Sequence, residues 1–371
     1  MPHPRQPERR RATIKDVARV AGVSPALVSL VLNDQPGASD ANRAKVRAAA
    51  DELGYRPDAH ATFLRRRRAN LLGVAFSVQS AFHGDLLQGI YAAAAATGYE
   101  VVLSGSTADR PEADAIAALG DFRCDALILL GPEAPVKEID ELAAQLPVVI
   151  IGRPLTSHSA DTVRTDERMG MRLAVDYLAS MGHELITHVD GGGFKGLERL
   201  TGYLEAMEGR GLAAGVEVIP GGETIEAGLA AGRTLLSLPG RRTSVIAYDD
   251  DCAWGLMTAF AEGGVSVPGD LSVVGYDGGR LSRLTPLSTL TTVRQDADGL
   301  ARRSVERAIS WIEGRREPIP DELLAPSLVT GGSTAPRPAE PGARHAAASA
   351  APVVPPPVNA PLPNRTRGGA R

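Results

Sequence analysis

The stretch that decides the fold lies near the start of the chain and reads Thr13-Ile-Lys-Asp-Val-Ala-Arg-Val-Ala-Gly-Val-Ser-Pro-Ala-Leu-Val-Ser-Leu-Val-Leu-Asn33. Thr13 and Asp16 have the spacing of a capping-box variant, and apolar residues then repeat at helical spacing as far as Ala21. Gly22 suits the left-handed turn that ends a helix, and Ser24 is a good N-cap for the next one. The stretch therefore predicts two short helices joined by a tight turn, which is a helix-turn-helix.

A third amphipathic helix is expected from Ser39 through Ala50 to Gly54, and it would close a small core with the first two. Periodicity alone leaves a plain three-helix bundle open as an alternative. Charge favours a head that binds a polyanion, because residues 1–70 hold 14 Lys and Arg against 7 Asp and Glu, and the remainder holds 26 against 37. The other interpretation of this charge is a solvated basic face.

Composition excludes several classes of protein. A chain of 371 residues with 43% hydrophobic and 23% charged residues is neither disordered nor small, and it has room for two or three domains. No apolar run approaches the ~18 residues of a membrane span, and the first dozen residues are rich in Pro and Arg instead of forming an apolar secretion segment. Two cysteines are too few for a disulfide framework or a four-cysteine zinc site. We expect a cytoplasmic protein with no membrane contact, no metal site and no cofactor.

Residues 71–333 alternate short β-branched or leucine-rich runs with longer amphipathic stretches. The predicted strands are Leu71–Ser77, Glu100–Leu103, Ala126–Leu130, Val148–Ile151, Leu185–Val189, Val216–Ile219, Ser244–Tyr248 and Ser272–Gly275. The predicted helices include Asp85–Ala96, Arg168–Ser180, Gly196–Gly209, Ala253–Glu262 and Gly299–Glu313. This order predicts parallel sheets in right-handed βαβ units, and eight strands favour two lobes, divided near residues 162–166, with return crossings near 289–295 and 320–330.

The end of the chain has a different composition. Residues 334–371 contain nine prolines, many alanines and a single leucine, Leu362. We expect a disordered extension there, whose truncation after Gly332 leaves stability unchanged. One leucine is too few for a heptad-repeat tetramerisation segment, so a dimer is expected.

The chain resembles the LacI/GalR family of bacterial transcriptional regulators. The resemblance rests on the head quoted above, on Glu52-Leu-Gly-Tyr-Arg-Pro57, on Val273-Val-Gly-Tyr-Asp277 and on Thr285-Pro, and it covers roughly residues 12–333. It implies an all-α helix-turn-helix DNA-binding head and an α/β effector domain of two flavodoxin-like lobes, like a periplasmic binding protein. The expected parts are a disordered basic N-terminus at 1–11, the head at 12–57, a hinge at 58–70, the two lobes at 71–333 and the tail at 334–371.

The resemblance places the second helix in the major groove of DNA. The candidate DNA contacts in the head are Thr13, Ser24, Pro25, Ala26, Ser29, Leu30 and Asn33. Family members often carry an arginine or histidine where Leu30 stands and a polar residue where Ala26 stands, so this face offers no bidentate base contact and thymine methyls are its expected partners. For Ser24 and Asn33, local helix capping is an equal alternative to a contact with DNA.

The segment Pro57-Asp-Ala-His-Ala-Thr-Phe-Leu-Arg-Arg-Arg-Arg68 matches the family's hinge helix. There the resemblance implies that Leu64 from each subunit wedges into the minor groove and kinks the duplex. The adjacent Arg65 and Arg66 would neutralise phosphates. A polar linker with incidental charge is the alternative.

The resemblance places a small-molecule effector between the lobes. The candidate effector-binding residues are Phe82, His83, Arg199, Asp249 and Asp277. An arginine facing carboxylates suits hydrogen bonds to ring hydroxyls, although an ion pair between the lobes would use the same residues. Aromatic surface is limited to Phe82 and to Tyr248 or Trp254, which favours a sugar over a nucleobase. A strongly anionic ligand would need a second cation beside Arg199, such as protonated His83.

An enzyme is disfavoured, because Asp249-Asp-Asp251 is accompanied by no Ser-His-Asp order and no paired-histidine metal motif. A transport-type sugar-binding protein without DNA function is disfavoured by the helix-turn-helix. We therefore expect a homodimeric repressor that binds a pseudo-palindromic operator in double-stranded DNA and responds to a sugar. A regulator of the same architecture that senses a purine or another metabolite is the alternative. Induction and co-repression use the same cleft, so both stay open.

Overall fold

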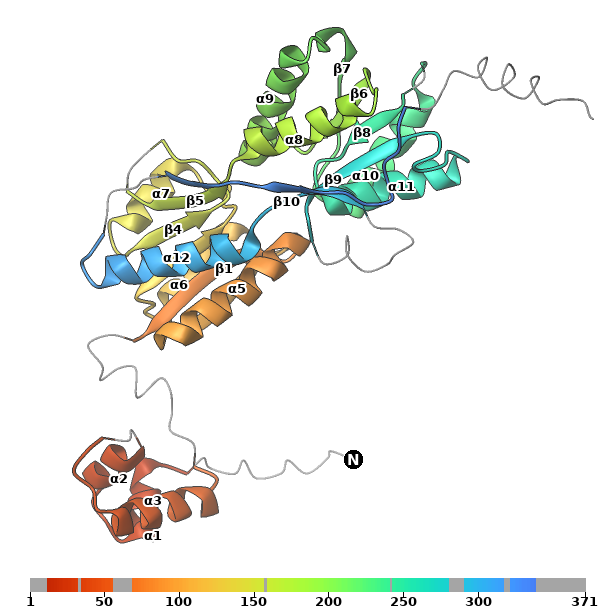
Figure 1. The fold of residues 1–371 in the computed structure, drawn as a ribbon. Coiled ribbons are helices and arrows are strands. Elements are labelled where there is room, and N and C mark those ends of the chain that lie inside the picture. Colours follow the sequence, from red (N-terminus) through yellow and green to blue (C-terminus); the bar gives the residue numbers. More distant parts are fainter. Residues whose placement is uncertain are drawn as a thin grey trace, which may run out of the picture.

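The computed structural model describes residues 12–32, 35–55, 69–156, 159–240, 242–279, 290–316 and 321–337. The head consists of α1 (Ile14–Ala21), α2 (Pro25–Leu32) and α3 (Asp40–Glu52) (Figure 1). The capping box forms, because Asp16 N donates to Thr13 Oγ1 and Thr13 N donates to the Asp16 carboxylate, and Gly22 takes the left-handed conformation at φ 65°. The buried side chains of the three helices pack on one another: Val17, Ala18, Val28, Val31, Val46, Ala49 and Ala50.

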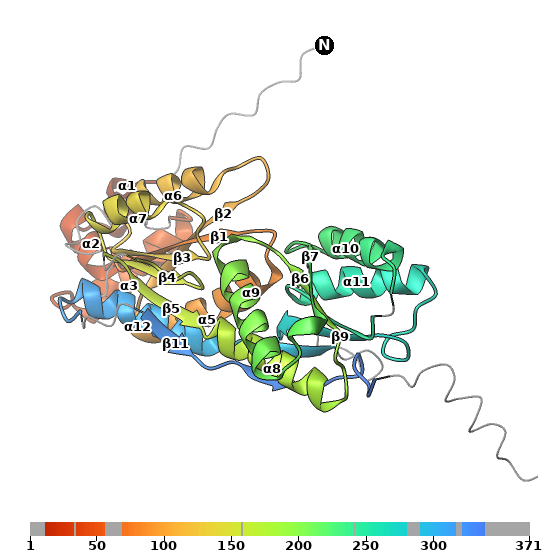
Figure 2. The ribbon, with the colours of Figure 1, turned by 90° about the horizontal axis from the view of Figure 1, so that it is seen from above.

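The first lobe is a six-stranded parallel sheet in the order β11-β5-β4-β3-β1-β2. Its strands are β1 (Leu71–Ser77), β2 (Glu100–Ser106), β3 (Ala126–Leu130), β4 (Val148–Ile151), β5 (Asp161–Thr165) and β11 (Asp321–Leu324). Its helices are α5 (Ala81–Thr97), α6 (Glu112–Gly120), α7 (Val136–Ala143) and α12 (Ala297–Ile312). Helices α5 and α12 cover one face of the sheet, and α6 and α7 cover the other (Figure 2). Apolar residues therefore fill both faces of the strands, as a parallel sheet requires.

The second lobe repeats this architecture in the order β12-β10-β9-β8-β6-β7, with β12 antiparallel to β10. Its strands are β6 (Ile186–Asp190), β7 (Val216–Pro220), β8 (Ser244–Ile246), β9 (Ser272–Asp277), β10 (Thr291–Arg294) and β12 (Ser327–Val329). Its α-helices are α8 (Glu167–Ser180), α9 (Gly193–Gly209), α10 (Ile225–Ser237) and α11 (Asp250–Glu262). Helices α8 and α9 pack on one face of the sheet and α10 and α11 on the other (Figure 2).

The chain passes between the lobes three times, from β5 to α8, from β10 to α12 and from β11 to β12. Figure 1 shows these connections running side by side between the two sheets. In each lobe the loops that follow the parallel strands face the other lobe, and ligand sites of open α/β sheets lie at such carboxyl ends. No helix of the described residues is long and apolar enough to cross a membrane.

The expected tail boundary at residue 334 is wrong, because ordered packing continues to Arg337. Ser333 is buried, and its hydroxyl donates to the carbonyl of Val273 at 2.6 Å. The carbonyl of Ala335 accepts a hydrogen bond from His183 Nε2 at 3.0 Å, and Arg337 pairs with Glu184 at 2.8 Å. Proline-rich composition hid these contacts because they use backbone groups and small polar side chains. The expected N-terminus at 1–11 and the tail after 337 lie outside the described residues.

Candidate functional site

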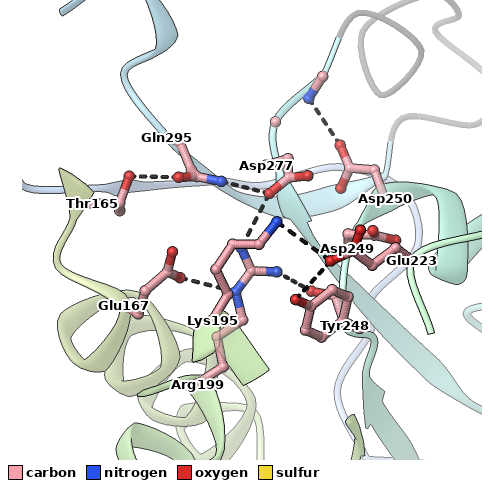
Figure 3. Close-up of polar contacts among 12 residues, drawn as sticks. Thr165, Glu167, Lys195, Arg199, Glu223, Tyr248, Asp249, Asp250, Asp277 and Gln295 are labelled. Carbon is pink, nitrogen blue, oxygen red and sulfur yellow. Dashed lines mark hydrogen bonds and ion pairs between the residues drawn. The ribbon is translucent and has the colours of Figure 1, made fainter. Parts of the chain in front are cut away.

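A polar cleft lies between the lobes, at the carboxyl ends of both sheets. Its lining combines first-lobe residues from the ends of β1, β3 and β4 with second-lobe residues from the ends of strands and the starts of helices. The charged and amide side chains of the second-lobe lining are Glu167, Lys195, Arg199, Glu223, Asp249, Asp277 and Gln295 (Figure 3), and the first lobe adds His83. The cleft therefore gathers the five candidate effector residues, since Phe82 also lines it.

Arg199 is the centre of the polar network and is only 2% exposed. Its guanidinium donates to Glu167 at 2.9 Å, to the carbonyl of Tyr248 and to Asp277 at 3.3 Å (Figure 3). The charges of Glu167 and Asp277 overcome the effect of burial and raise the pKa of Arg199 well above its ordinary value. All these partners belong to the second lobe. The alternative interpretation, in which Arg199 forms an ion pair between the lobes, therefore does not apply.

Lys195 is a cleft residue that sequence reasoning missed. It lies four residues before Arg199 on α9, so both cations lie on one face of that helix. Its ammonium is 3.4 Å from Glu223 Oε1, which also accepts a hydrogen bond from the Tyr248 hydroxyl at 3.2 Å. The predicted helix began at Gly196, which left Lys195 outside the periodic pattern. Extending the helix by one turn would have found it.

Three aspartates gather where β8 and β9 end. Asp249 caps α11 by accepting from Cys252 N at 2.7 Å, and burial together with the charge of Asp277 raises its pKa to about 7. Asp250 accepts from Thr292 and from Gly279 N, and burial raises its pKa well above the ordinary value. Asp277 has φ 100°, a conformation uncommon for a residue other than glycine, and hydrogen bonds from Arg199 and Gln295 hold it there.

His83 faces the cleft from the first lobe. Its Nδ1 accepts from Ser77 N at 3.1 Å. Burial and the nearby charge of Lys195 lower the pKa of His83 to about 4, so the imidazole is neutral at pH 7. The second cation of the cleft is therefore Lys195, and His83 is not the second cation that a strongly anionic ligand would need. Of the aromatic residues, Phe82 and Tyr248 line the cleft, whereas Trp254 packs against the core beneath α11.

The lobes touch beside the cleft. Arg153 follows β4 in the first lobe, and its guanidinium carbon lies 3.8 Å from the ring centroid of Phe194 on α9. The free volume left inside is about 20 Å³. That is room for about one water molecule. The structure thus shows a closed cleft, and a ligand as large as a sugar ring requires the lobes or the side chains to move.

In the head, the exposed start of α2 carries Ser24, Pro25 and Ala26, while Ser29 and Leu30 are half-buried. Ser24 Oγ accepts from Leu27 N at 3.2 Å, which is the capping role weighed above. Thr13 is likewise a cap, because its hydroxyl oxygen accepts from Asp16 N while its own N–H donates to the Asp16 carboxylate. The remaining DNA-contact candidates, Asn33, Leu64, Arg65 and Arg66, lie outside the described residues, as does most of the hinge.

Comparison with known proteins agrees with this architecture. Residues 13–58 match the model for bacterial regulatory proteins of the lacI family, and residues 175–334 match a periplasmic binding protein-like domain. The Escherichia coli regulator GalR is 34% identical over 324 residues, which are 86% of this chain and 94% of GalR. The chain belongs to the lacI family of bacterial regulatory proteins. This lacI-family chain is also 34% identical to the E. coli ribose operon repressor, over 81% of the chain and 93% of the repressor.

Among solved structures, the lac repressor dimer bound to operator and the anti-inducer ONPF has a TM-score of 0.75 and 27% identity. The match covers 88% of this lacI-family chain and 100% of the lac repressor chain. The chain is accordingly a DNA-binding transcriptional regulator with an effector-binding domain, and its relatives are regulators, not enzymes. The helix-turn-helix head and the two α/β lobes expected from the sequence are confirmed.

Proposed function

We propose that this regulator is a repressor that binds a pseudo-palindromic operator as a homodimer and is controlled by a sugar bound between the lobes. A two-fold symmetric dimer presents two heads to two half-sites, which is how helix-turn-helix dimers read DNA. Such a protein acts where the operator is, in the cytoplasm. The relatives named as GalR, the ribose operon repressor and the lac repressor support a sugar as the effector class.

The single observation that carries the proposal is the composition of the cleft. Its lining supplies a guanidinium, an ammonium, an amide and several carboxylates, which together suit the alternating donors and acceptors of a polyol. Its aromatic lining is limited to Phe82 and Tyr248 among the described residues. A flat purine is held better by more stacking surface, so the cleft favours a sugar.

On the DNA side, we propose that Pro25, Ala26 and Leu30 make apolar contacts in the major groove and that Ser29 makes polar ones. Pro25 and Ala26 are exposed at the start of α2, which is the end of a recognition helix that faces base edges. Neither Ala26 nor Leu30 can make a bidentate hydrogen bond to guanine or adenine. Specificity must come partly from the hinge, where we propose that Leu64 kinks the duplex and that Arg65 and Arg66 hold phosphates.

Coupling between the two sites is reciprocal. An effector that favours a lobe arrangement in which the hinge cannot order lowers operator affinity, and operator then lowers effector affinity by the same factor. Because the described cleft is closed, an effector has to stabilise a different lobe arrangement in order to enter. The molecule therefore has two lobe arrangements. An inducer and the operator favour different arrangements, whereas a co-repressor and the operator favour the same one.

The test combines a gel shift on the intergenic DNA beside the protein's own gene with a thermal-shift screen of monosaccharides, disaccharides, sugar phosphates and purines. A ligand at a hundredfold its Kd stabilises the fold by about 2.7 kcal/mol. The hit should vanish in Arg199→Ala and in Asp277→Ala while operator binding persists. Stabilisation by purines alone would overturn the sugar assignment.

A further inference from the structure

The charges that line the cleft do not balance. Four carboxylates, those of Glu167, Glu223, Asp249 and Asp277, face two cations. Lys195 pairs with Glu223 at 3.4 Å. Arg199 serves both Glu167 and Asp277. Asp249 has no ion pair with any described residue, although only 8% of it is exposed.

In Asp249 and in Asp277, only one of the two carboxylate oxygens accepts a hydrogen bond from the described residues. Asp249 Oδ1 accepts the capping hydrogen bond from Cys252 N, and no donor of the described residues reaches its Oδ2. Asp277 Oδ1 accepts from both Arg199 and Gln295, and its Oδ2 likewise has no donor among the residues that the structure describes. Buried carboxylate oxygens are stable when donors or cations reach them. Both side chains line the cleft, so a ligand bound there can donate hydrogen bonds to these two oxygens. Figure 3 shows both carboxylates beside Arg199.

We propose that the effector is a sugar that carries an ammonium group, an amino sugar, whose nitrogen is held by Asp249 and Asp277. This inference rests on the proposed sugar-sensing function and narrows its ligand class. An ammonium group provides three donors for the two unused carboxylate oxygens, and its positive charge offsets one of the two excess negative charges. Hydroxyl groups of the same ring take the remaining donors and acceptors of the cleft lining.

The other groups around the cleft leave no second source of positive charge among the described residues. The His83 ring faces the site from α5, and burial keeps it neutral at pH 7. Lys195 is held by Glu223, whose pKa lies below its ordinary value because the ammonium outweighs the effect of burial. Asp250 and Asp251 lie on the helix that Asp249 caps, and burial raises the pKa of both carboxyls. Each is either negatively charged or protonated and neutral, so neither supplies a positive charge. A phosphorylated or carboxylated sugar therefore meets repulsion here, and a neutral sugar leaves Asp249 without a charge partner.

Binding of an ammonium group also displaces a proton. The carboxyl of Asp249 titrates near neutrality, raised by burial and by Asp277 and lowered by Arg199. A cation beside it favours the ionised form, so the proton leaves for solvent while the ligand keeps its charge. Neutral sugars lack this linkage.

The experiment uses the full-length protein and calorimetric titration with matched pairs, glucosamine against glucose and galactosamine against galactose, with glucuronate as the anionic arm. We expect the amino sugar of at least one pair to bind about tenfold tighter than its parent, since charge-assisted hydrogen bonds exceed neutral ones by that order. Titration in two buffers of different ionisation enthalpy should show net proton release with the amino sugar alone.

Asp249→Asn keeps a side chain that can cap α11 and removes the unbalanced charge, so it should abolish both the preference and the proton release. The matched control is Glu138→Gln, which removes an exposed carboxylate of α7 in the first lobe, outside the cleft lining, and should change neither. A parent sugar that binds as tightly as its amino derivative overturns this inference and leaves sugar sensing intact. Failure of every sugar, amino or neutral, overturns both.

Discussion

Arg153 in the first lobe stacks on Phe194 in the second, with 3.8 Å between its guanidinium carbon and the ring centroid. Each residue is next in sequence to one that lines the cleft, Gly152 and Lys195. The arginine is 2% exposed and also donates to the carbonyl of Pro132, so it is held in place on its own lobe. Phe194 lies in the first turn of α9, the helix that carries Lys195 and Arg199. Opening the cleft therefore separates a cation from an aromatic ring at the same time as it exposes the polar network.

Phe194→Leu should shift the ligand-free protein toward an open arrangement of the lobes. A cation–π contact contributes about 0.5–2 kcal/mol, and leucine retains apolar area without the ring. Small-angle X-ray scattering should show a larger radius of gyration than for the wild type. The matched control is Trp311→Leu, which removes the stacking of Arg316 at 3.7 Å within the first lobe. An equal change in both variants would mean that Phe194 does not hold the lobes together.

Asp249→Asn should make the protein more stable at pH 8 than the wild type. The pKa of Asp249 is about 7 in the folded protein, above the ordinary aspartate value of about 3.9 in the unfolded chain. Between these values the folded state keeps a proton that the unfolded state has released, so wild-type stability falls as pH rises from about 4 to about 7.

The substitution removes that loss, which amounts to up to about 4 kcal/mol at 1.36 kcal/mol per pKa unit. Urea unfolding at pH 5 and pH 8 measures the difference. Asp296→Asn, at the N-cap of α12, controls for the change of capping residue. If the stability of Asp249→Asn changes between pH 5 and pH 8 as much as that of the wild type, the raised pKa does not belong to Asp249.

Contrary to the expectation from composition, truncation after Gly332 should destabilise the second lobe, whereas truncation after Arg337 should not. The first removes Ser333 and Ala335, whose hydrogen bonds satisfy buried groups of β9 and His183. Each buried group left without a partner costs about 1–3 kcal/mol. Differential scanning calorimetry of the two truncated proteins checks this, and equal melting temperatures would show that residues 333–337 contribute nothing.

Leu30→Arg should change the preferred operator toward guanine in the half-sites, because arginine supplies the bidentate contact that leucine lacks. Leu30 is half-buried, and its side chain lies beside Gly37. Because it is not part of the buried core, we expect the head to fold with the longer arginine side chain projecting outward. A binding-site selection with wild type and variant in parallel measures the shift. Identical selected sites would place Leu30 outside the groove.

Leu64→Ala and Arg66→Ala should separate DNA bending from salt dependence. Loss of an apolar wedge reduces the kink and the specific affinity, while loss of one phosphate contact lowers the slope of log affinity against log salt by about one. Circular-permutation gel shifts and a salt titration provide the two readouts. Wild-type bending by Leu64→Ala would remove the wedge role from this residue.

Neighbouring residues were sufficient to predict much of the fold. The capping box of Thr13 and Asp16, the strands Leu71–Ser77 and Ala126–Leu130, and the helix–strand alternation all depend on signals a few residues long. The strands β5, β10, β11 and β12 were not predicted as strands. Their sequences are short and, like Asp-Glu-Leu-Leu in β11, mix polar and apolar residues, so only pairing with neighbouring strands made them strands.

The cleft shows the same division. Phe82, His83, Arg199, Asp249 and Asp277 were all predicted to face a ligand, from the residues at family positions, and they do line one cleft. Glu223, Glu167 and Gln295 were not predicted, because each stands alone in the sequence with no periodic or motif partner. They meet Lys195, Arg199 and Asp277 only because separate strands and helices end at the same edge of a folded lobe. The protonation states of the cleft residues also depend on the tertiary structure. The neutral His83 and the raised pKa of Asp249 arise from burial and from charges that folding brings close, and residue type alone specifies neither.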